Sequence, residues 1–121
     1  MKLRIQENTL RFRLTQTEVA RLRDAGHVES CITFAPGRAL AYRLERSVQE
    51  LCIRVDFDDS VIRVTVPAGI VTGWADSDQV GIEASSEAGA QILIEKDFQC
   101  LHKPADRDPD GYPNPLAAVK T

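Results

Sequence analysis

The sequence predicts an α+β fold, in which one main helix and a short second helix pack against a curled antiparallel sheet of about six to eight strands. Apolar residues alternate with polar ones along most of the chain, as in strands that bury one face. Turn-forming residues separate consecutive apolar runs by only a few positions, which favours antiparallel hairpins. Such a sheet could be barrel-like, but alternation alone does not decide whether it closes.

The N-terminus predicts a hairpin with an apolar face and a basic face. Apolar and polar residues alternate on both sides of a turn at residues 7–9. The apolar face holds Leu3, Ile5, Leu10, Phe12 and Leu14, and the basic face holds Lys2, Arg4, Arg11 and Arg13.

A helix is predicted over residues 16–25. Thr15 and Glu18 have the Ser/Thr-x-x-Glu spacing of a capping box, in which two side chains bind the free amides of a helix start. Val19 and Leu22 lie three positions apart and would face the core, and Gly26 is suited to end the helix.

The rest of the chain predicts further strands and a short second helix. Pro67 can begin this helix, which would end near Asp76. No internal repeat is evident. Strands are expected at 28–34, 39–44, 51–57, 62–66, around 80–82 and at 91–100.

Residues 1–103 are predicted to form a single domain, followed by a C-terminal tail at residues 104–121. The tail holds four of the chain's six prolines and three aspartates, a composition that does not build a core element. It could lie along the domain, with Tyr112 and Leu116 as anchors, or remain disordered.

Composition narrows the class of protein without indicating one function. The formal net charge is −3 and the pI about 5.3, so a nucleic-acid partner is not expected, because such proteins usually carry a basic excess. No apolar run approaches the ~20 residues that span a bilayer, and no secretory leader is evident, so we expect a cytoplasmic protein without a membrane partner. The cysteines Cys31, Cys52 and Cys100 lack paired spacing and fit reduced thiols.

The basic face of the N-terminal hairpin is the first candidate binding site. Arg4, Arg11 and Arg13 would project from one sheet surface, where guanidinium groups can donate paired hydrogen bonds to phosphate or carboxylate. Arg54 and Arg63 would join them if their strands are neighbours. The alternative is a solvated sheet face balanced by acidic residues, which is common in antiparallel sheets.

The end of the last predicted strand concentrates reactive side chains. Lys96 and His102 are candidate contributors to anion binding, and Asp97 and Cys100 are candidate reactive groups. Cys100 and His102 would share one face of a strand, where a thiolate beside an imidazole could act as nucleophile and base or as half of a metal site. Zinc would need further ligands from elsewhere, so we assign no metal site. The alternative to a reactive pair is that Cys100 is a small buried residue and that His102 is a surface residue at the end of the strand.

Each of two acidic motifs has both a functional interpretation and a simpler one. Glu95 and Asp97 would share a strand face and could bind a divalent cation or transfer protons, but a solvated sheet edge or ion pairs with the arginines would also explain them. Residues 106–111 reproduce the first half of a calcium loop. Ala117 stands where the bidentate glutamate of such a loop belongs, so an acidic proline-rich tail is the favoured interpretation.

The chain resembles a family of short bacterial single-domain proteins of unknown function. The resemblance is carried by the opening at residues 8–14 (Asn-x-x-Arg-x-Arg-Leu), the block at 96–101 (Lys-Asp-Phe-Gln-Cys-Leu) with His102 and Lys103, and the Pro-Asn-Pro-Leu at 113–116. It implies membership of that family but no activity.

The residues favour a small binding or interaction module that holds an anionic small molecule or protein partner on the basic face. The alternative is a small hydrolase or transferase, metal-assisted or not, that uses Asp97, Cys100 and His102. The sequence leaves open whether the protein is an enzyme and what its oligomeric state is, and it indicates no cofactor. Self-association through an exposed strand edge is a third hypothesis.

Overall fold

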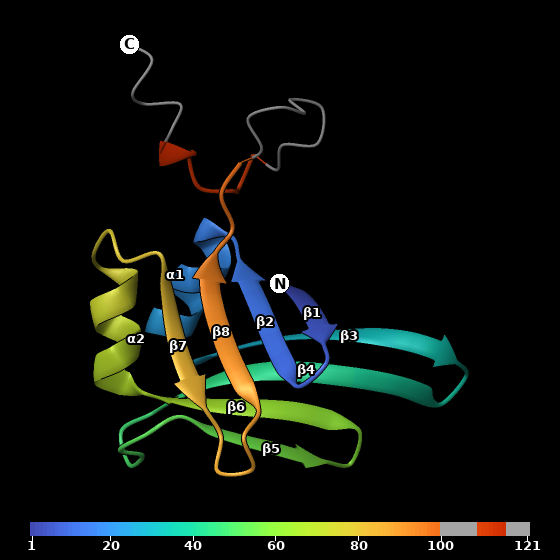
Figure 1. Ribbon diagram of the computed structural model, residues 1–121. Coiled ribbons are helices and arrows are strands. Elements are labelled where there is room, and N and C mark those ends of the chain that lie inside the picture. Colours follow the sequence, from blue (N-terminus) through green and yellow to red (C-terminus); the bar gives the residue numbers. More distant parts are fainter. Residues whose placement is uncertain (100–108, 116–121) are drawn as a thin grey trace.

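The computed structural model describes residues 1–99 and 109–115 (Figure 1). Within these residues, eight strands form two four-stranded sheets that cross one another, and two helices contact strands of both sheets. In chain order the elements are β1 (Lys2–Gln6), β2 (Thr9–Leu14), α1 (Gln16–Asp24), β3 (His27–Ala35), β4 (Arg38–Ser47), β5 (Arg54–Asp58), β6 (Val61–Pro67), α2 (Ala68–Ala75), β7 (Gly81–Ser85) and β8 (Gln91–Lys96).

The prediction of one curled antiparallel sheet is wrong, although the α+β class is confirmed. The first sheet has the order β1-β2-β8-β7 and the second sheet the order β3-β4-β6-β5, and neither closes into a barrel. Each sheet joins two antiparallel hairpins through a parallel central pair, β2 with β8 and β4 with β6. Local alternation identified the hairpins but holds no information on which distant strands pair.

The two halves of the chain have the same order of elements, each with a hairpin, a helix and a second hairpin. β1 begins at Lys2 and β5 at Arg54, 52 positions later, and β2 and β6 begin at Thr9 and Val61, also 52 positions apart. Each sheet takes one hairpin from each half, so the two sheets are equivalent in topology.

This internal repeat was missed in the sequence because equivalent positions share apolar character rather than identity. Phe12 corresponds to Val64, and Leu22 to Trp74, by the same 52-residue offset. All four side chains are fully buried. Because burial constrains apolarity and volume more than residue type, two halves can keep a common core without recognisable similarity.

The core lies between the sheets and is completed by one face of each helix. Thr15 and Glu18 form the predicted capping box at the start of α1, and Gly26, at a φ of 90°, follows its last turn. The helix buries Val19 and Leu22, as predicted. The buried apolar residues are Phe12, Leu14, Val19, Leu22, Val28, Leu44, Val64, Val66, Val71, Trp74, Ile82, Ile92 and Ile94.

Residues 109–115 pack on the domain next to the end of β8. Tyr112 forms a β-bridge with Phe98, and their rings contact at 5.9 Å between centroids. Asp110 accepts hydrogen bonds from the backbone and hydroxyl of Thr17 at the start of α1. Tyr112 is therefore an anchor, as one of the two tail hypotheses expected, whereas Leu116 lies outside the described residues. No helix among the described residues is long and apolar enough to cross a membrane.

Candidate functional site

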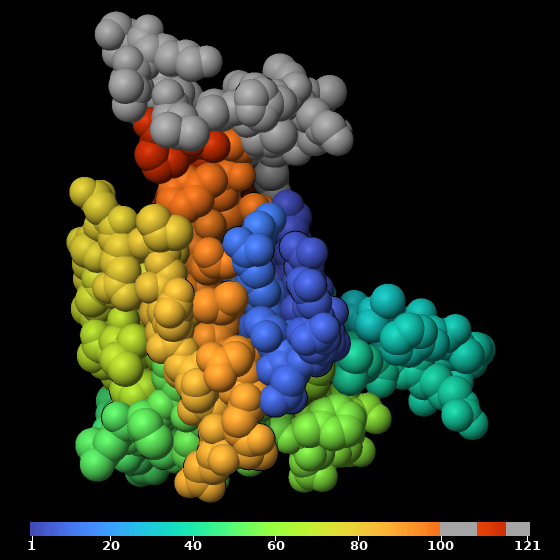
Figure 2. Space-filling view, in the orientation of Figure 1, coloured from blue at the N-terminus to red at the C-terminus, as the bar shows by residue number. Residues whose placement is uncertain are grey.

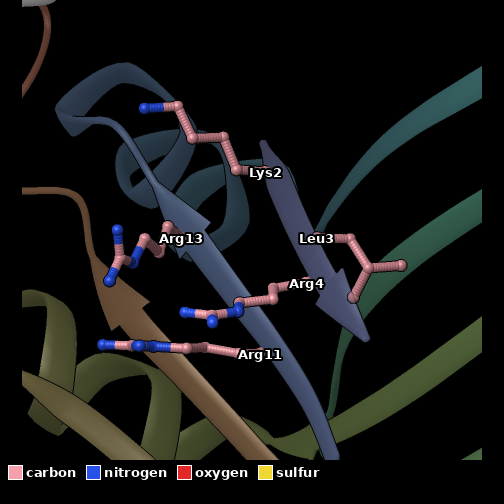
Figure 3. A pocket seen from close by; sticks show the side chains of 5 residues that line it. All are labelled: Lys2, Leu3, Arg4, Arg11 and Arg13. Atoms are coloured by element: carbon pink, nitrogen blue, oxygen red, sulfur yellow. The ribbon is translucent and has the colours of Figure 1, made fainter. Parts of the chain in front are cut away.

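The β1–β2 hairpin places four basic side chains on the outer face of the first sheet. A two-residue turn at Glu7 and Asn8, with Glu7 at a φ of 50°, sets the register. In that register Lys2 is opposite Arg13 and Arg4 is opposite Arg11. Figure 3 shows these side chains on one side of the two strands, with Leu3 pointing to the other side.

Like charges directly opposite each other destabilise a strand pair, so this arrangement needs compensation. β8, next to β2, provides part of it. Arg11 forms an ion pair with Glu95, and the Lys2 Nζ lies 2.9 Å from the Asp97 carboxylate, whose side chain is largely buried. The ion-pair interpretation of Glu95 and Asp97 is thus the one the structure bears out, with a lysine in place of one arginine.

Arg4 and Arg13 have no carboxylate partner among residues 1–99 and 109–115. With Lys2, Leu3 and Arg11 they line a pocket of about 150 Å³. A cavity of this volume holds several water molecules, so it can take a phosphate or carboxylate group with part of its hydration. The guanidinium donors around it are chemically suited to such oxyanions.

The second sheet shows that the fold itself does not require positive charge at the positions of Arg4 and Arg13. Asp56 occupies the position equivalent to Arg4, and Thr65 the position equivalent to Arg13. Arg63, the equivalent of Arg11, lies 3.0 Å from Glu45, which repeats the Arg11–Glu95 pair. The excess of positive charge is therefore a property of the first sheet alone.

Arg54 and Arg63 do not join the basic face, because β5 and β6 belong to the second sheet. Arg54 forms an exposed pair with Glu50 at 3.2 Å. The two residues would have extended the basic face only if their strands were neighbours of β1 or β2, and they are not.

Lys96 points away from the basic face and into the molecule. Its Nζ donates a hydrogen bond to the Ser77 carbonyl at 2.6 Å and lies 5.9 Å and 5.5 Å from the ring centroids of Trp74 and Tyr112. Burial lowers the pKa of Lys96 below 10.5. Strand alternation could have indicated this, because Lys96 has the parity of the buried Ile92 and Ile94.

Of the other candidate residues at the end of the last strand, the structure describes Asp97 but not Cys100 or His102. Asp97 is engaged by Lys2 and its backbone amide donates to Leu14, so its carboxylate serves to bind β8 to the basic hairpin. Cys100 and His102 lie outside the described residues, as does the first half of the motif at 106–111. Among the described residues, no three His, Cys, Asp or Glu side chains form a group that could hold a metal ion.

Comparison with known proteins identifies the family of the chain. No curated protein and no solved structure matches the chain. A family model, described as a family of unknown function (DUF7009), matches residues 1–116, which include both sheets, both helices and the basic hairpin. The chain therefore belongs to this family of unknown function.

Proposed function

We propose that the protein is a binding module that holds an anionic group, phosphate or carboxylate, on the basic face of Lys2, Arg4, Arg11 and Arg13. The observation that supports this most is the pair Arg4 and Arg13. Both stand among other cations without a carboxylate partner in the described part of the chain, at positions where the equivalent sheet has Asp56 and Thr65.

Like-charged neighbours that the fold does not need destabilise the free protein, so a ligand that neutralises them binds with additional free energy. A bound oxyanion would accept from Arg4 and Arg13, while Glu95 and Asp97 keep Arg11 and Lys2 in place. Lys96 has no part in this site, because its ammonium group lies on the opposite side of β8.

We place the module in the cytoplasm. Cys31 and Cys52 are both exposed and free. Two exposed thiols are expected to persist in a reducing compartment and to oxidise elsewhere.

Thermal unfolding with inorganic phosphate and tripolyphosphate, at matched ionic strength, tests the proposal. A ligand at a hundred times its Kd stabilises a protein by about 2.7 kcal/mol, which raises the Tm of a domain this size by several degrees. We expect this shift in the natural protein and its loss in the double variant Arg4→Thr, Arg13→Thr.

The matched control is Arg21→Thr with Arg38→Thr, which removes the same charge from exposed positions outside the face. The control should keep the shift. Equal shifts in both double variants, or no shift with any anion in the natural protein, would exclude anion binding at this face.

A further inference from the structure

Among the described residues β1 pairs with β2 alone, and its other edge lies beside a part of the second sheet that the first sheet leaves uncovered. β1 is the end strand of the first sheet. The β3–β4 hairpin extends past it, as Figure 1 shows, and in Figure 2 this hairpin projects from the body next to the N-terminal strand. One further strand alongside β1 would lie over the projecting hairpin.

The uncovered part continues the core-facing surface of the second sheet. Val28 and Leu44 are opposite each other in the register of β3 and β4 and both are buried. Ile32 and Leu40 are opposite each other on the same face, four residues further along each strand, and Ile32 is 48% exposed. On the inner side of β1, Ile5 is 58% exposed.

The equivalent hairpin in the other half does not project in this way. β3 and β4 have 9 and 10 residues, whereas β7 and β8 have 5 and 6. The extra length carries Ile32 and Leu40, and a β-bulge at 33–35 holds the exposed Phe34. Because a shorter hairpin satisfies the same topology, the apolar extension is an addition to the fold.

The backbone of β1 is suited to pair with a further strand. In a two-residue hairpin the pair that flanks the turn, here Gln6 and Thr9, exchanges hydrogen bonds, and the pattern then alternates. Lys2 and Arg4 therefore direct their backbone groups to β2, and Leu3 and Ile5 direct theirs outward. An added strand would meet donors and acceptors along this edge.

We propose that the β1 edge binds an extended segment of a partner protein in which acidic and apolar side chains alternate. The segment extends the first sheet, with its carboxylates beside Lys2 and Arg4 and its apolar side chains over Ile5, Ile32 and Leu40. This inference rests on the proposed function, since its carboxylates use the same basic face.

Charge decides between this occupant and a second copy of the chain. Two β1 strands paired about a two-fold axis would bring Lys2 and Arg4 next to the same residues of the partner, which adds to the repulsion already present with Arg11 and Arg13. Carboxylates on the added strand remove that repulsion.

Fluorescence anisotropy with a labelled short peptide of alternating glutamate and valine tests the proposal. A peptide with the same residues in two blocks is the control ligand, because it has the same charge but cannot present two faces as a strand. We expect the alternating peptide to bind at least about tenfold more tightly than the block peptide. The double variant Ile32→Gln, Leu40→Gln should lose this preference and keep the thermal shift with phosphate.

Phe57→Gln is the matched protein control. Phe57 is 68% exposed and is the equivalent of Ile5 at the edge of the second sheet, so its replacement should leave peptide binding unchanged. Equal binding of the two peptides would overturn the inference while anion binding stands. A dimer in light scattering that dissociates in Ile32→Gln, Leu40→Gln would also overturn it, because a second copy would then cover the surface.

Discussion

Lys96 and Arg46 make equivalent contacts in the two halves of the molecule. Each lies on the strand that pairs in parallel with the other half, opposite Leu14 and Val66 respectively. Each donates a hydrogen bond to a backbone carbonyl near the end of a helix, Arg46 to Arg23 in the last turn of α1 and Lys96 to Ser77, two residues after the end of α2. Cations are favourable near the C-terminal end of a helix, because the helix dipole places partial negative charge there.

The two cations differ in their surroundings, and this gives the first prediction. Lys96 is buried against Trp74 and Tyr112, and burial lowers its pKa, whereas Arg46 is half-buried. Between the lowered pKa and 10.5 the unfolded chain binds a proton that the folded protein does not, so stability rises with pH in that window. Lys96→Met keeps the apolar stem and should abolish this rise.

Urea unfolding at several pH values up to 10.5 measures the effect as the difference in unfolding free energy between the natural protein and Lys96→Met. The difference should grow in favour of the natural protein as pH increases. Arg46→Met is the control, because arginine stays charged throughout this range and its variant should show no such trend. A difference independent of pH for Lys96→Met would show that its ammonium group is not desolvated.

The start of α1 provides the second prediction. The Thr15 side chain accepts from the Glu18 amide, and the Glu18 carboxylate accepts from the Thr15 amide. Thr15→Ala should therefore destabilise the protein by about 1 kcal/mol. Pro67, at the equivalent position before α2, makes no side-chain cap, so Pro67→Ala offers a comparison at a helix start that lacks this bond. Chemical denaturation of Thr15→Ala measures the loss, and an unchanged midpoint would contradict the cap's contribution.

Local sequence patterns predicted most elements but not the way in which they assemble. The capping box at Thr15 and the alternation of Leu10, Phe12 and Leu14 each follow from neighbours a few residues apart, and both are confirmed. The parallel pair β2 and β8 joins residues some eighty positions apart, such as Leu14 and Lys96. No local pattern specifies that pairing, so one antiparallel sheet was predicted where two mixed sheets exist.

The sequence likewise predicted the local features of the candidate site but not its contacts with distant strands. The shared face of Arg4, Arg11 and Arg13 follows from the period of a strand. Their separation from the Lys96 side chain was predictable too, because Lys96 has the parity of the buried Ile92 and Ile94. The partners Glu95 and Asp97 could be placed beside the basic hairpin only once β8 was known to lie next to β2.

Asp110 gives the third prediction, which concerns the attachment of residues 109–115 to the domain. Hydrogen bonds from the hydroxyl of Thr15 and from Thr17 lower the pKa of the Asp110 carboxyl below 3.8. The folded protein thus holds the ionised form more strongly than the unfolded chain does. This stabilisation is present above pH 3.8 and is lost as pH falls through the lowered pKa.

Asp110→Asn removes the charge beside the start of α1, where the helix dipole favours an anion. The variant should be less stable than the natural protein at neutral pH, and the difference should disappear in acid below the lowered pKa. Asp58→Asn, at the exposed end of β5, removes the same charge away from any helix start and should leave stability nearly unchanged.

Hydrogen exchange of the Gln16 amide, which donates to the Asp110 carbonyl, reports the attachment of residues 109–115 directly. If the Gln16 amide exchanges faster in Asp110→Asn while the Phe12 amide in the core stays protected, the carboxylate holds this segment on α1. Equal exchange rates in the two proteins would show that the Tyr112 contacts hold the segment without the carboxylate.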